Sequence, residues 1–359
     1  MPSRRHFILG VGAGVVGIGA LGAGYVFRGK LAALRRGCSV RGLPDVAARA
    51  GKGLPAAAGK SRVVQVQHAR VLTAAGRPDP RAVQAMLDLA LRRAFDVEKP
   101  EDAWRALFPD PTEVVGLKVN AVAGRGGVNS SPETVRAITR GLGLAGIPKE
   151  NVLVFERSHE ELTAAGFVMN PDGPGVRVIA TNSLFRTTQL APQALTVAGQ
   201  PVRLVQMVRL CSAIINCSVV KHHGSAGYTG ALKNWYGVID QPQRFHQGLH
   251  SASFIPEVAG LDPIRTRVRL TVIEALRSQC ERGPHAAREW QHTPRALMVG
   301  SDQVALDAVG ARLVEEERRR RGLPSLAETG REPSYISVAA SRGLGRSDAA
   351  AIEHLLDEV

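Results

Sequence analysis

Three segments decide the fold class: the apolar stretch VVGLKV (residues 114–119), the segment SPETVRAITRGLGL (131–144) and a second apolar stretch, VLVF (152–155). An uninterrupted apolar run of this length is typical of a strand that is covered on both faces of its sheet. The middle segment begins with Ser131 as a helix N-cap and Pro132 in the first turn, so we predict a helix there. A strand, a helix and a strand in succession favour a right-handed βαβ unit and a parallel sheet.

The same alternation extends on both sides of this unit, as judged from hydrophobic periodicity and helix start signals. The predicted strands cover 62–67, 202–205, 212–220, 268–276 and 296–299, and the predicted helices cover 79–95, 303–319 and 349–356. We therefore predict an α/β fold with a largely parallel sheet or sheets and flanking helices. These are arranged either as one lobe or as two lobes around a crevice.

The first residues suggest export. The stretch SRRHFIL (3–9) resembles the twin-arginine motif, an address that a receptor reads. Residues 7–27 are about long enough to cross a bilayer, but their seven glycines make them only weakly hydrophobic. We predict a twin-arginine signal over 1–36, the twin-arginine translocase as a partner, and a periplasmic or otherwise extracytoplasmic location. Membrane attachment through 7–27 is the alternative.

After this segment we predict a linker, rich in Gly, Ala and Arg, over 37–60 and an α/β domain over 61–359. The formal net charge of the 359 residues is +14, but six of the positive charges precede residue 37. Aromatic residues make up only 4% and are not interleaved with a basic run, so no nucleic-acid partner is expected. The four cysteines form no CxxC pair, so neither an iron–sulfur cluster nor a zinc ribbon is expected.

The stretch KHHGSAGYTGALKN (221–234) is the best candidate for a chemical site. Its small residues let the backbone approach a ligand closely, and it follows a predicted buried strand. Ligands of open α/β sheets bind beyond the carboxyl ends of strands. We predict that His223 moves a proton and that Lys233 binds an anion or a cofactor, or acts as a nucleophile if it is buried. His222 and Asn234 are predicted ligand-binding residues.

Other polar residues extend this candidate site. Lys118 and Asn120 are two apart at the end of a predicted strand, so both face the same way and are expected to bind the ligand. Arg125 lies in a Gly-rich loop, where it could clamp an anion. His246 and His250 are four apart, so on a helix they would share a face and could hold a metal ion together.

Several stretches together resemble the DUF362 family, a domain of unknown function, over roughly residues 60–347. They are VGLKVN (115–120), the helix start SPE (131–133), ENV (150–152), KHHGSAGYTGALKN (221–234), FH (245–246), SDQVALD (301–307), YI (335–336) and GLG (343–345). Some members of that family carry iron–sulfur cysteine motifs, which this chain lacks. The resemblance implies no activity.

The shorter stretch HGSAGYTGALK (223–233) resembles a loop of the nickel-pincer lactate racemase family. The resemblance implies that His223 is an acid/base, that Lys233 tethers an organic nickel cofactor, and that His246 or His250 ligates the metal. The chain departs from that family's pattern because Leu232 replaces an arginine and the Gly-rich loop around Arg125 contains no histidine.

Three functions remain open at this point. The first is an enzyme that acts on a small anionic hydroxy or keto acid with a transition metal or a metal-organic cofactor. The second is a non-catalytic periplasmic protein that binds or carries a metal or an anion. The third is a partner in the maturation of an exported metalloenzyme. An open metal coordination position would favour catalysis, and a closed one structure or carriage.

Overall fold

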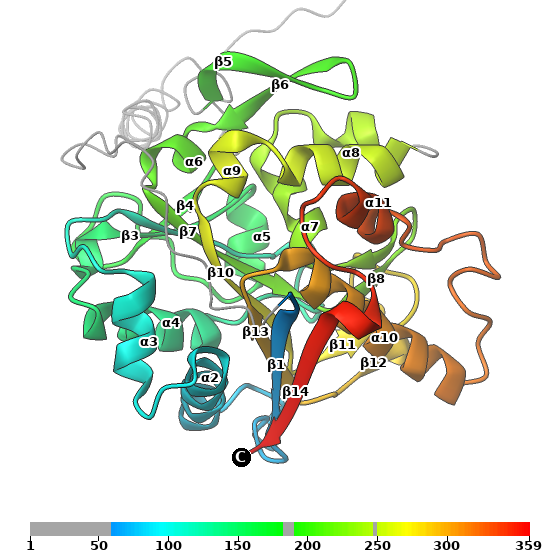
Figure 1. Cartoon of the computed structure of the whole chain (residues 1–359), viewed down its shortest axis with the longest axis horizontal. Helices are drawn as coiled ribbons and strands as arrows, with labels where there is room; N and C mark the ends of the chain where they lie inside the picture. The colour runs from blue at the N-terminus through cyan, green and yellow to red at the C-terminus, as the bar shows by residue number, and fades with distance from the viewer. Residues whose placement is uncertain (1–58, 182–189, 247–249) are drawn as a thin grey trace, which may run out of the picture. The chain divides into compact units, whose positions relative to one another are not determined.

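The computed structural model describes residues 59–181, 190–246 and 250–359 (Figure 1). The predicted signal over 1–36 and all but the last two residues of the predicted linker lie outside these ranges. No described helix combines the length and the apolar character that a membrane span needs. The described residues all belong to one compact unit.

An eight-stranded sheet organises this unit, in the order β14-β1-β13-β10-β7-β2-β3-β4. Five of its seven pairings are parallel, and only β13 runs antiparallel to its two neighbours. The predicted, largely parallel α/β fold is therefore confirmed. Its strands are β1 (Ser61–Gln67), β2 (Val115–Lys118), β3 (Val152–Glu156), β4 (Arg177–Ala180), β7 (Ala213–Val219), β10 (Val268–Ala275), β13 (Ala296–Gly300) and β14 (Ile352–Glu358).

Helices cover both faces of this sheet. Ala213, Ile215 and Cys217 of β7 belong to the core that also contains the buried faces of α2 (Pro80–Phe95), α3 (Pro100–Leu107) and α4 (Pro132–Leu144). Side chains alternate along a strand, so Asn216 points to the opposite face, where it bonds to residues of α7 (Ala231–Asn234) and α10 (Gln303–Arg320). Ser131 caps α4 as its sequence predicted, and Asp79 caps α2.

Three small hairpins surround the sheet: β5–β6 (Leu190–Val197 and Gln200–Val205), β8–β9 (Lys221–His223 and Gly227–Thr229) and β11–β12 (Ser278–Gln279 and Gln291–His292). The remaining helices are α5 (His159–Ala164), α6 (Gln206–Leu210), α8 (His250–Ala259), α9 (Asp262–Arg265) and α11 (Tyr335–Ser341). Short 3₁₀ turns are η1 (Lys149–Asn151), η2 (Trp235–Val238), η3 (Pro242–Phe245), η4 (Arg288–Trp290) and η5 (Ala349–Ala351).

One predicted helix is wrong. Residues 349–356 form the turn η5 and most of strand β14, which pairs in parallel with β1 along its whole length. The segment is short, and its apolar residues fit a helical stripe about as well as a strand. Long-range pairing decided the outcome, because a strand's preference depends mainly on the neighbours against which it packs.

Candidate active site

A cavity of about 90 Å³ lies on the α7 face of the sheet, where the carboxyl ends of three neighbouring parallel strands meet. Five of the nine predicted site residues line it: Asn120, His223, Lys233, Asn234 and His246. They come from the segment after β2, from hairpin β8–β9, from α7 and from the turn after η3. Residues that are distant in sequence thus converge where the ends of the strands place them.

Lys233 is the most unusual group in this cavity. Its side chain is only 6% exposed, and its Nζ lies 3.1 Å from His246 Nε2 and 4.2 Å from the centre of the Tyr236 ring. Burial, together with the nearby charge of Lys221, lowers the pKa of Lys233 from 10.5 to about 7. A large fraction of Lys233 is therefore a neutral, nucleophilic amine near pH 7.

His246 is placed to accept a proton from this amine. Its Nδ1 lies 2.8 Å from the carbonyl oxygen of Pro242, so Nδ1 carries the ring proton and donates it to that carbonyl. Nε2 is then the acceptor that faces Lys233. Burial and the charge of Lys233 lower the pKa of His246 to about 4, which keeps the ring neutral at physiological pH.

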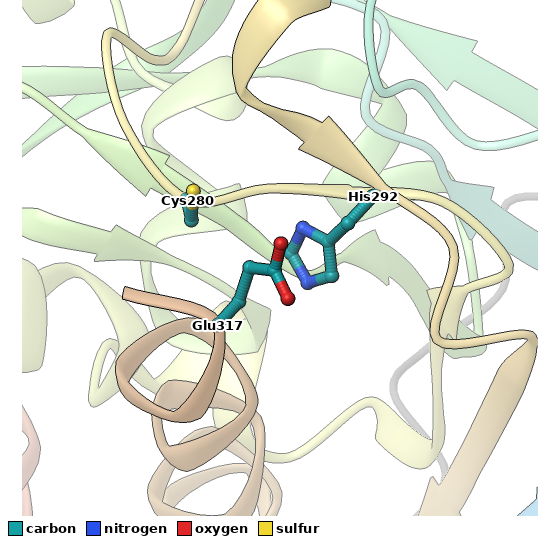
Figure 2. A group of neighbouring side chains, drawn as sticks. All are labelled: Cys280, His292 and Glu317. Atoms are coloured by element: carbon teal, nitrogen blue, oxygen red, sulfur yellow. The ribbon is translucent and has the colours of Figure 1, made fainter. Parts of the chain in front are cut away.

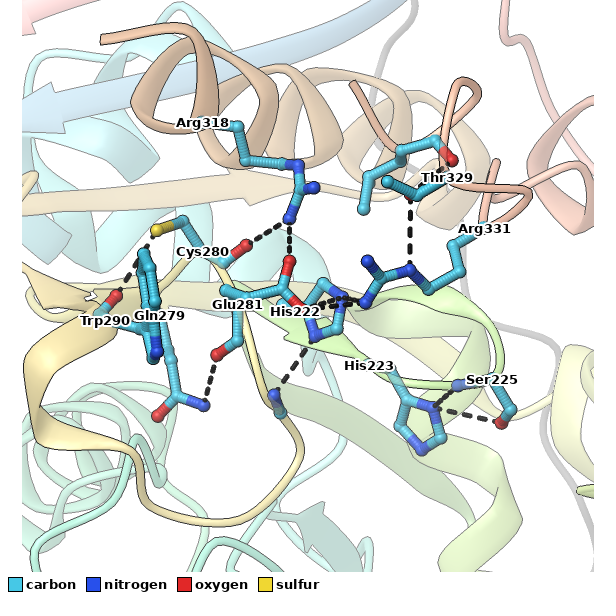
Figure 3. Close-up of polar contacts among 12 residues, drawn as sticks. His222, His223, Ser225, Gln279, Cys280, Glu281, Trp290, Arg318, Thr329 and Arg331 are labelled. Carbon is cyan, nitrogen blue, oxygen red and sulfur yellow. Dashed lines mark hydrogen bonds and ion pairs between the residues drawn. The ribbon is translucent and has the colours of Figure 1, made fainter. Parts of the chain in front are cut away.

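His223 has the opposite tautomer. Its Nδ1 accepts from the backbone N–H groups of Ser225 and Ala226, at 3.3 and 3.4 Å (Figure 3). The ring proton therefore resides on Nε2. Burial first, and then the charge of Lys233, lowers the pKa of His223 far below its usual range. His223 stacks on His246 with 5.6 Å between ring centres. This arrangement makes His223 a neutral hydrogen-bond donor through Nε2, and its predicted role in moving a proton stays a prediction.

Asn234 is held by two predicted neighbours. Lys118 Nζ and Asn120 Nδ2 each donate to Asn234 Oδ1 at 3.2 Å, so their predicted common direction is confirmed. Lys118 also pairs with Glu156 at 2.9 Å and is fully buried. It supports the floor of the cavity and is not among the residues that line it.

Lys221 is the third buried lysine, and no role was predicted for it. Its Nζ donates to Asn120 Oδ1 and to the carbonyl of Val128, both at 2.9 Å. Burial lowers its pKa to about 7, although Glu156 opposes this shift. The three lysines 118, 221 and 233 are thus buried around Asn120 and Asn234 together with one buried carboxylate, that of Glu156. This excess of positive charge suits an anionic ligand.

His222 lies on the other side of the hairpin from His223 (Figure 3). Its Nδ1 accepts from the backbone N–H of Gly283 at 3.0 Å, and its Nε2 is 3.1 Å from the guanidinium of Arg331. Glu281 joins this network by ion pairs with Arg331 and Arg318. His222 therefore contacts a structural ion network, and it is not among the residues that line the cavity.

Two other predicted residues have different positions. Arg125 is exposed in its loop and is not among the residues that line the cavity. His246 follows η3 whereas His250 begins α8, so the two histidines do not share one helix. The side chain of His250 lies outside the described part of the structure, and a metal site formed by this pair stays a prediction.

Sequence reasoning missed Glu156 and Tyr236, which line the cavity. Glu156 ends β3 at the same sheet edge at which Lys118 ends β2, so the rule that identified Lys118 could have found Glu156.

The role of Asp307 was not predicted from the sequence either. Its carboxylate accepts hydrogen bonds from the backbone N–H groups of Ala231 and Leu232 at 2.6 and 2.9 Å. Burial raises the pKa of Asp307 to about 7. Asp307 anchors the start of the short helix that carries Lys233.

A group of side chains suited to a metal ion lies away from this cavity. Atoms of Cys280, His292 and Glu317 that can ligate a metal all lie within 4.8 Å of one another (Figure 2). None of the three is among the residues that line the cavity around Lys233.

Comparisons with solved structures find distant similarity. One match is a crystal structure of a Thermotoga maritima protein, with 14% identity, a TM-score of 0.38 and coverage of 61% of this chain and 59% of that one. Another is the lactate racemase apoprotein from Thermoanaerobacterium thermosaccharolyticum, with 10% identity, a TM-score of 0.41 and coverage of 74% and 61%. The chain thus spans about 60% of the length of these two structures.

No curated protein matches the chain. The model of the domain of unknown function DUF362 matches residues 115–312, which include the hairpin, α7 and most of the strands that carry the cavity. Because this match spans more than half of the 359 residues, the protein belongs to the DUF362 family.

Proposed function

We propose that this protein is an enzyme that binds a small keto acid in the cavity and uses Lys233 as the nucleophile on its carbonyl carbon. One observation carries the proposal: a buried amine with a pKa of about 7 lies 3.1 Å from the acceptor nitrogen of a neutral histidine. A nucleophile, its base and a third group that orients the base form the usual arrangement for covalent catalysis. Here these are Lys233, His246 and the carbonyl of Pro242.

The chemistry is imine formation. The neutral amine of Lys233 attacks the carbonyl carbon, a C–N bond forms, and the electron pair of the C=O π bond moves to oxygen. His246 Nε2 accepts a proton from the resulting ammonium and delivers it to the oxygen, which gives the carbinolamine. The nitrogen lone pair then forms the C=N bond while the C–O bond breaks, and the second proton of the nitrogen, relayed through His246, leaves with the hydroxyl group as water. The Nε2–H of His223 is a donor for the negative charge that develops on that oxygen. The products are an imine on Lys233 and one molecule of water.

The surrounding charges favour a carboxylate substrate. Lys118, Lys221 and Lys233 outnumber the buried carboxylate of Glu156. An anion beside Lys221 would stabilise the charged form of this lysine and offset part of the cost of its burial, while Lys233 reacts as the neutral amine. A keto acid supplies both the carbonyl for the amine and the negative charge for the site.

The volume of the cavity bears on whether Lys233 could hold the organic nickel cofactor that the resemblance of residues 223–233 implied. Its volume is about 90 Å³, far below the roughly 300–1,000 Å³ of pockets that hold larger organic ligands. His246 and the Tyr236 ring already contact the amine of Lys233. These residues fit a small substrate and do not fit an organic nickel cofactor attached to Lys233.

Reductive trapping tests the proposal. The purified full-length protein would be incubated with pyruvate and cyanoborohydride at pH 7, and the modified lysines located by peptide mass spectrometry. We expect a reduced adduct on Lys233 that is absent from Lys233→Met, with little modification of Lys149 in the exposed turn η1. Labelling of Lys149 as fast as Lys233 would contradict the proposal. Saturable pyruvate binding without any adduct would favour the non-catalytic anion-binding function instead.

We also propose that the protein is exported through the twin-arginine translocase and resides outside the cytoplasm. The support is the SRRHFIL stretch followed by a weakly hydrophobic, Gly-rich segment. In a bacterial host with this translocase, the protein carrying Arg4→Lys and Arg5→Lys should stay in the cytoplasm while the unaltered protein reaches the periplasm. Export of both would contradict it. The intact mass of the exported protein distinguishes a cleaved signal from a retained anchor.

A further inference from the structure

We propose that Cys280, His292 and Glu317 form a zinc-type metal site, and that the bound ion clamps the loop that walls the candidate active site. A thiolate, an imidazole and a carboxylate are ligands that Zn²⁺ accepts. The three residues belong to different segments: Cys280 follows β11, His292 ends β12, and Glu317 lies near the end of α10 (Figure 2). Tertiary folding alone brings them together.

His292 supplies the strongest argument. Both of its ring nitrogens are buried, and neither has a hydrogen-bond partner in the described part of the chain. Leaving a buried polar atom unsatisfied costs stability, so a native imidazole normally has a partner. A metal ion at one nitrogen would satisfy the side chain.

The geometry needs only small side-chain adjustments. Ligands about 2.0–2.3 Å from a tetrahedral ion lie about 3.3–3.8 Å from one another, and the three candidate atoms lie within 4.8 Å. The thiol of Cys280 donates to the carbonyl of Trp290 at 3.4 Å, and a metal would replace this proton. His292 and Glu317 also line a hollow in the surface, which leaves room for a water molecule as the fourth ligand.

Two arginines that bond to Glu317 are expected to weaken metal binding at this site. Arg320 donates to both oxygens of Glu317, and Arg321 donates to one of them. The hydrogen bonds from Arg320 first, and then those from Arg321, lower the pKa of Glu317 to about 2 and so keep it ionised. They also place positive charge beside the ion. Removing the largely exposed Arg320 should therefore tighten metal binding, whereas removing any ligand should weaken it.

The position of the site suggests what the ion does. Cys280 and His292 stand at the two ends of the segment 281–291, and residues near the start of this segment contact hairpin β8–β9 and the candidate active site. Gly283 donates to His222 Nδ1, its carbonyl accepts from Gly224 at 3.0 Å, and Pro284 lines the cavity. An ion bound to both ends and to α10 would hold this wall of the cavity in place.

Cobalt titration tests the metal site. Co²⁺ bound to a thiolate gives a charge-transfer absorption, and Zn²⁺ should displace it. We expect one saturable site in the full-length protein, no charge-transfer band in Cys280→Ser, and a loss of affinity beyond about tenfold in His292→Gln and Glu317→Gln. Cys211→Ser and His354→Gln are matched controls and should bind as the unaltered protein does. Arg320→Gln should bind more tightly.

Absence of saturable binding by the unaltered protein would overturn the site, as would loss of the band in Cys211→Ser but not in Cys280→Ser. Circular dichroism would confirm that each variant is folded.

Limited proteolysis tests whether the ion clamps the loop, because Arg282 in the loop is exposed (67%) and open to trypsin. Zn²⁺ should slow cleavage there at least about threefold in the unaltered protein and leave the rate unchanged in His292→Gln. An equal rate with and without Zn²⁺ would overturn the clamp.

Discussion

The two sides of hairpin β8–β9 differ in how their charges are balanced. On the His223 side, Lys221 and Lys233 are buried, and no carboxylate among the described residues pairs directly with either of them. The pKa of each falls to about 7. On the His222 side, Arg331 and the almost fully buried Arg318 both pair with Glu281. Hydrogen bonds from these arginines outweigh the effect of burial and lower the pKa of Glu281 to about 2.

This difference distinguishes a candidate binding site on the His223 side from a structural ion-pair network on the His222 side. A buried charge that is paired and hydrogen-bonded contributes to holding its neighbours in one arrangement, and removing its partner is strongly destabilising. A buried charge without a partner costs stability and persists where a ligand or a reaction needs it. Adjacent histidines in one short strand thus belong to regions with opposite energetic roles.

The largest effect is expected from Glu281→Gln. This change leaves the guanidinium of Arg318, which is 1% exposed, without its carboxylate, so the free energy of unfolding should fall by about 3 kcal/mol. Urea denaturation would measure it. Glu289→Gln is the control, because Glu289 and Arg282 form an exposed pair at 3.5 Å that is worth about 0–1 kcal/mol. If the two changes lowered the free energy of unfolding equally, the ion pairs of Glu281 would not have the stabilising role assigned to the His222 side.

The second effect has the opposite sign. Lys233→Met removes a buried charge that lacks a carboxylate partner, so the protein should become more stable at pH 7 by more than about 1.4 kcal/mol, the equivalent of one pKa unit. Lys118→Met is the matched buried lysine. It strips Glu156 of its partner at 2.9 Å and should destabilise the protein. If both changes destabilise it, Lys233 is a structural residue.

The third effect is the pH dependence of the stability that Lys233→Met gains over the unaltered protein. The pKa of Lys233 is about 7 in the folded protein against 10.5 as the ordinary value, so between these values the unfolded chain binds more protons and stability rises with pH. The advantage of Lys233→Met is therefore largest below pH 7. It should shrink by up to about 1.4 kcal/mol per pH unit above pH 7. Denaturation of both proteins from pH 6 to 9 would measure this, and a constant gap would show that Lys233 is not desolvated.

The smallest effect should distinguish the two histidines. His223→Gln removes a donor that faces the cavity, so pyruvate should bind about tenfold more weakly while the free energy of unfolding changes by less than about 1 kcal/mol. His222→Gln weakens a contact with Arg331 and should lower stability by about 1 kcal/mol while leaving pyruvate binding unchanged. Calorimetry would measure pyruvate binding, and urea denaturation would measure the free energy of unfolding. Weaker pyruvate binding by His222→Gln together with lower stability of His223→Gln would contradict the roles assigned to the two histidines.

Much of the candidate site was predictable because strand ends are visible in a sequence. Apolar runs locate β2, β3 and β7, and polar residues just after them must gather at one edge of a parallel sheet. This logic found Asn120 and His223, whereas Lys233 was found from its place after the small-residue loop. Arg125 was predicted from its Gly-rich loop, and it is not among the residues that line the cavity, because a loop between elements has no register that sets its direction. It was not applied to Glu156, although that residue ends β3.

Other features have no local signal. Asp307 anchors α7 from another helix 75 residues away, and the tautomers of His223 and His246 depend on backbone groups that the fold places beside them. The terminal strand β14 was mistaken for a helix because its partner β1 lies at the other end of the domain. In each case a contact between distant segments decided the outcome.

The sequence by itself determined the α/β class, the parallel strands and the family, because hydrophobic periodicity and motif spacing are local properties of the chain. It also identified the lysine and histidines of the candidate site. Only the tertiary structure decided their chemistry. Burial lowered the pKa of Lys233 to about 7, and a carbonyl group oriented His246 toward this amine. The fold also brought Cys280, His292 and Glu317 together from three separate segments. Protonation and ligation depend on desolvation and on neighbours, and folding sets both.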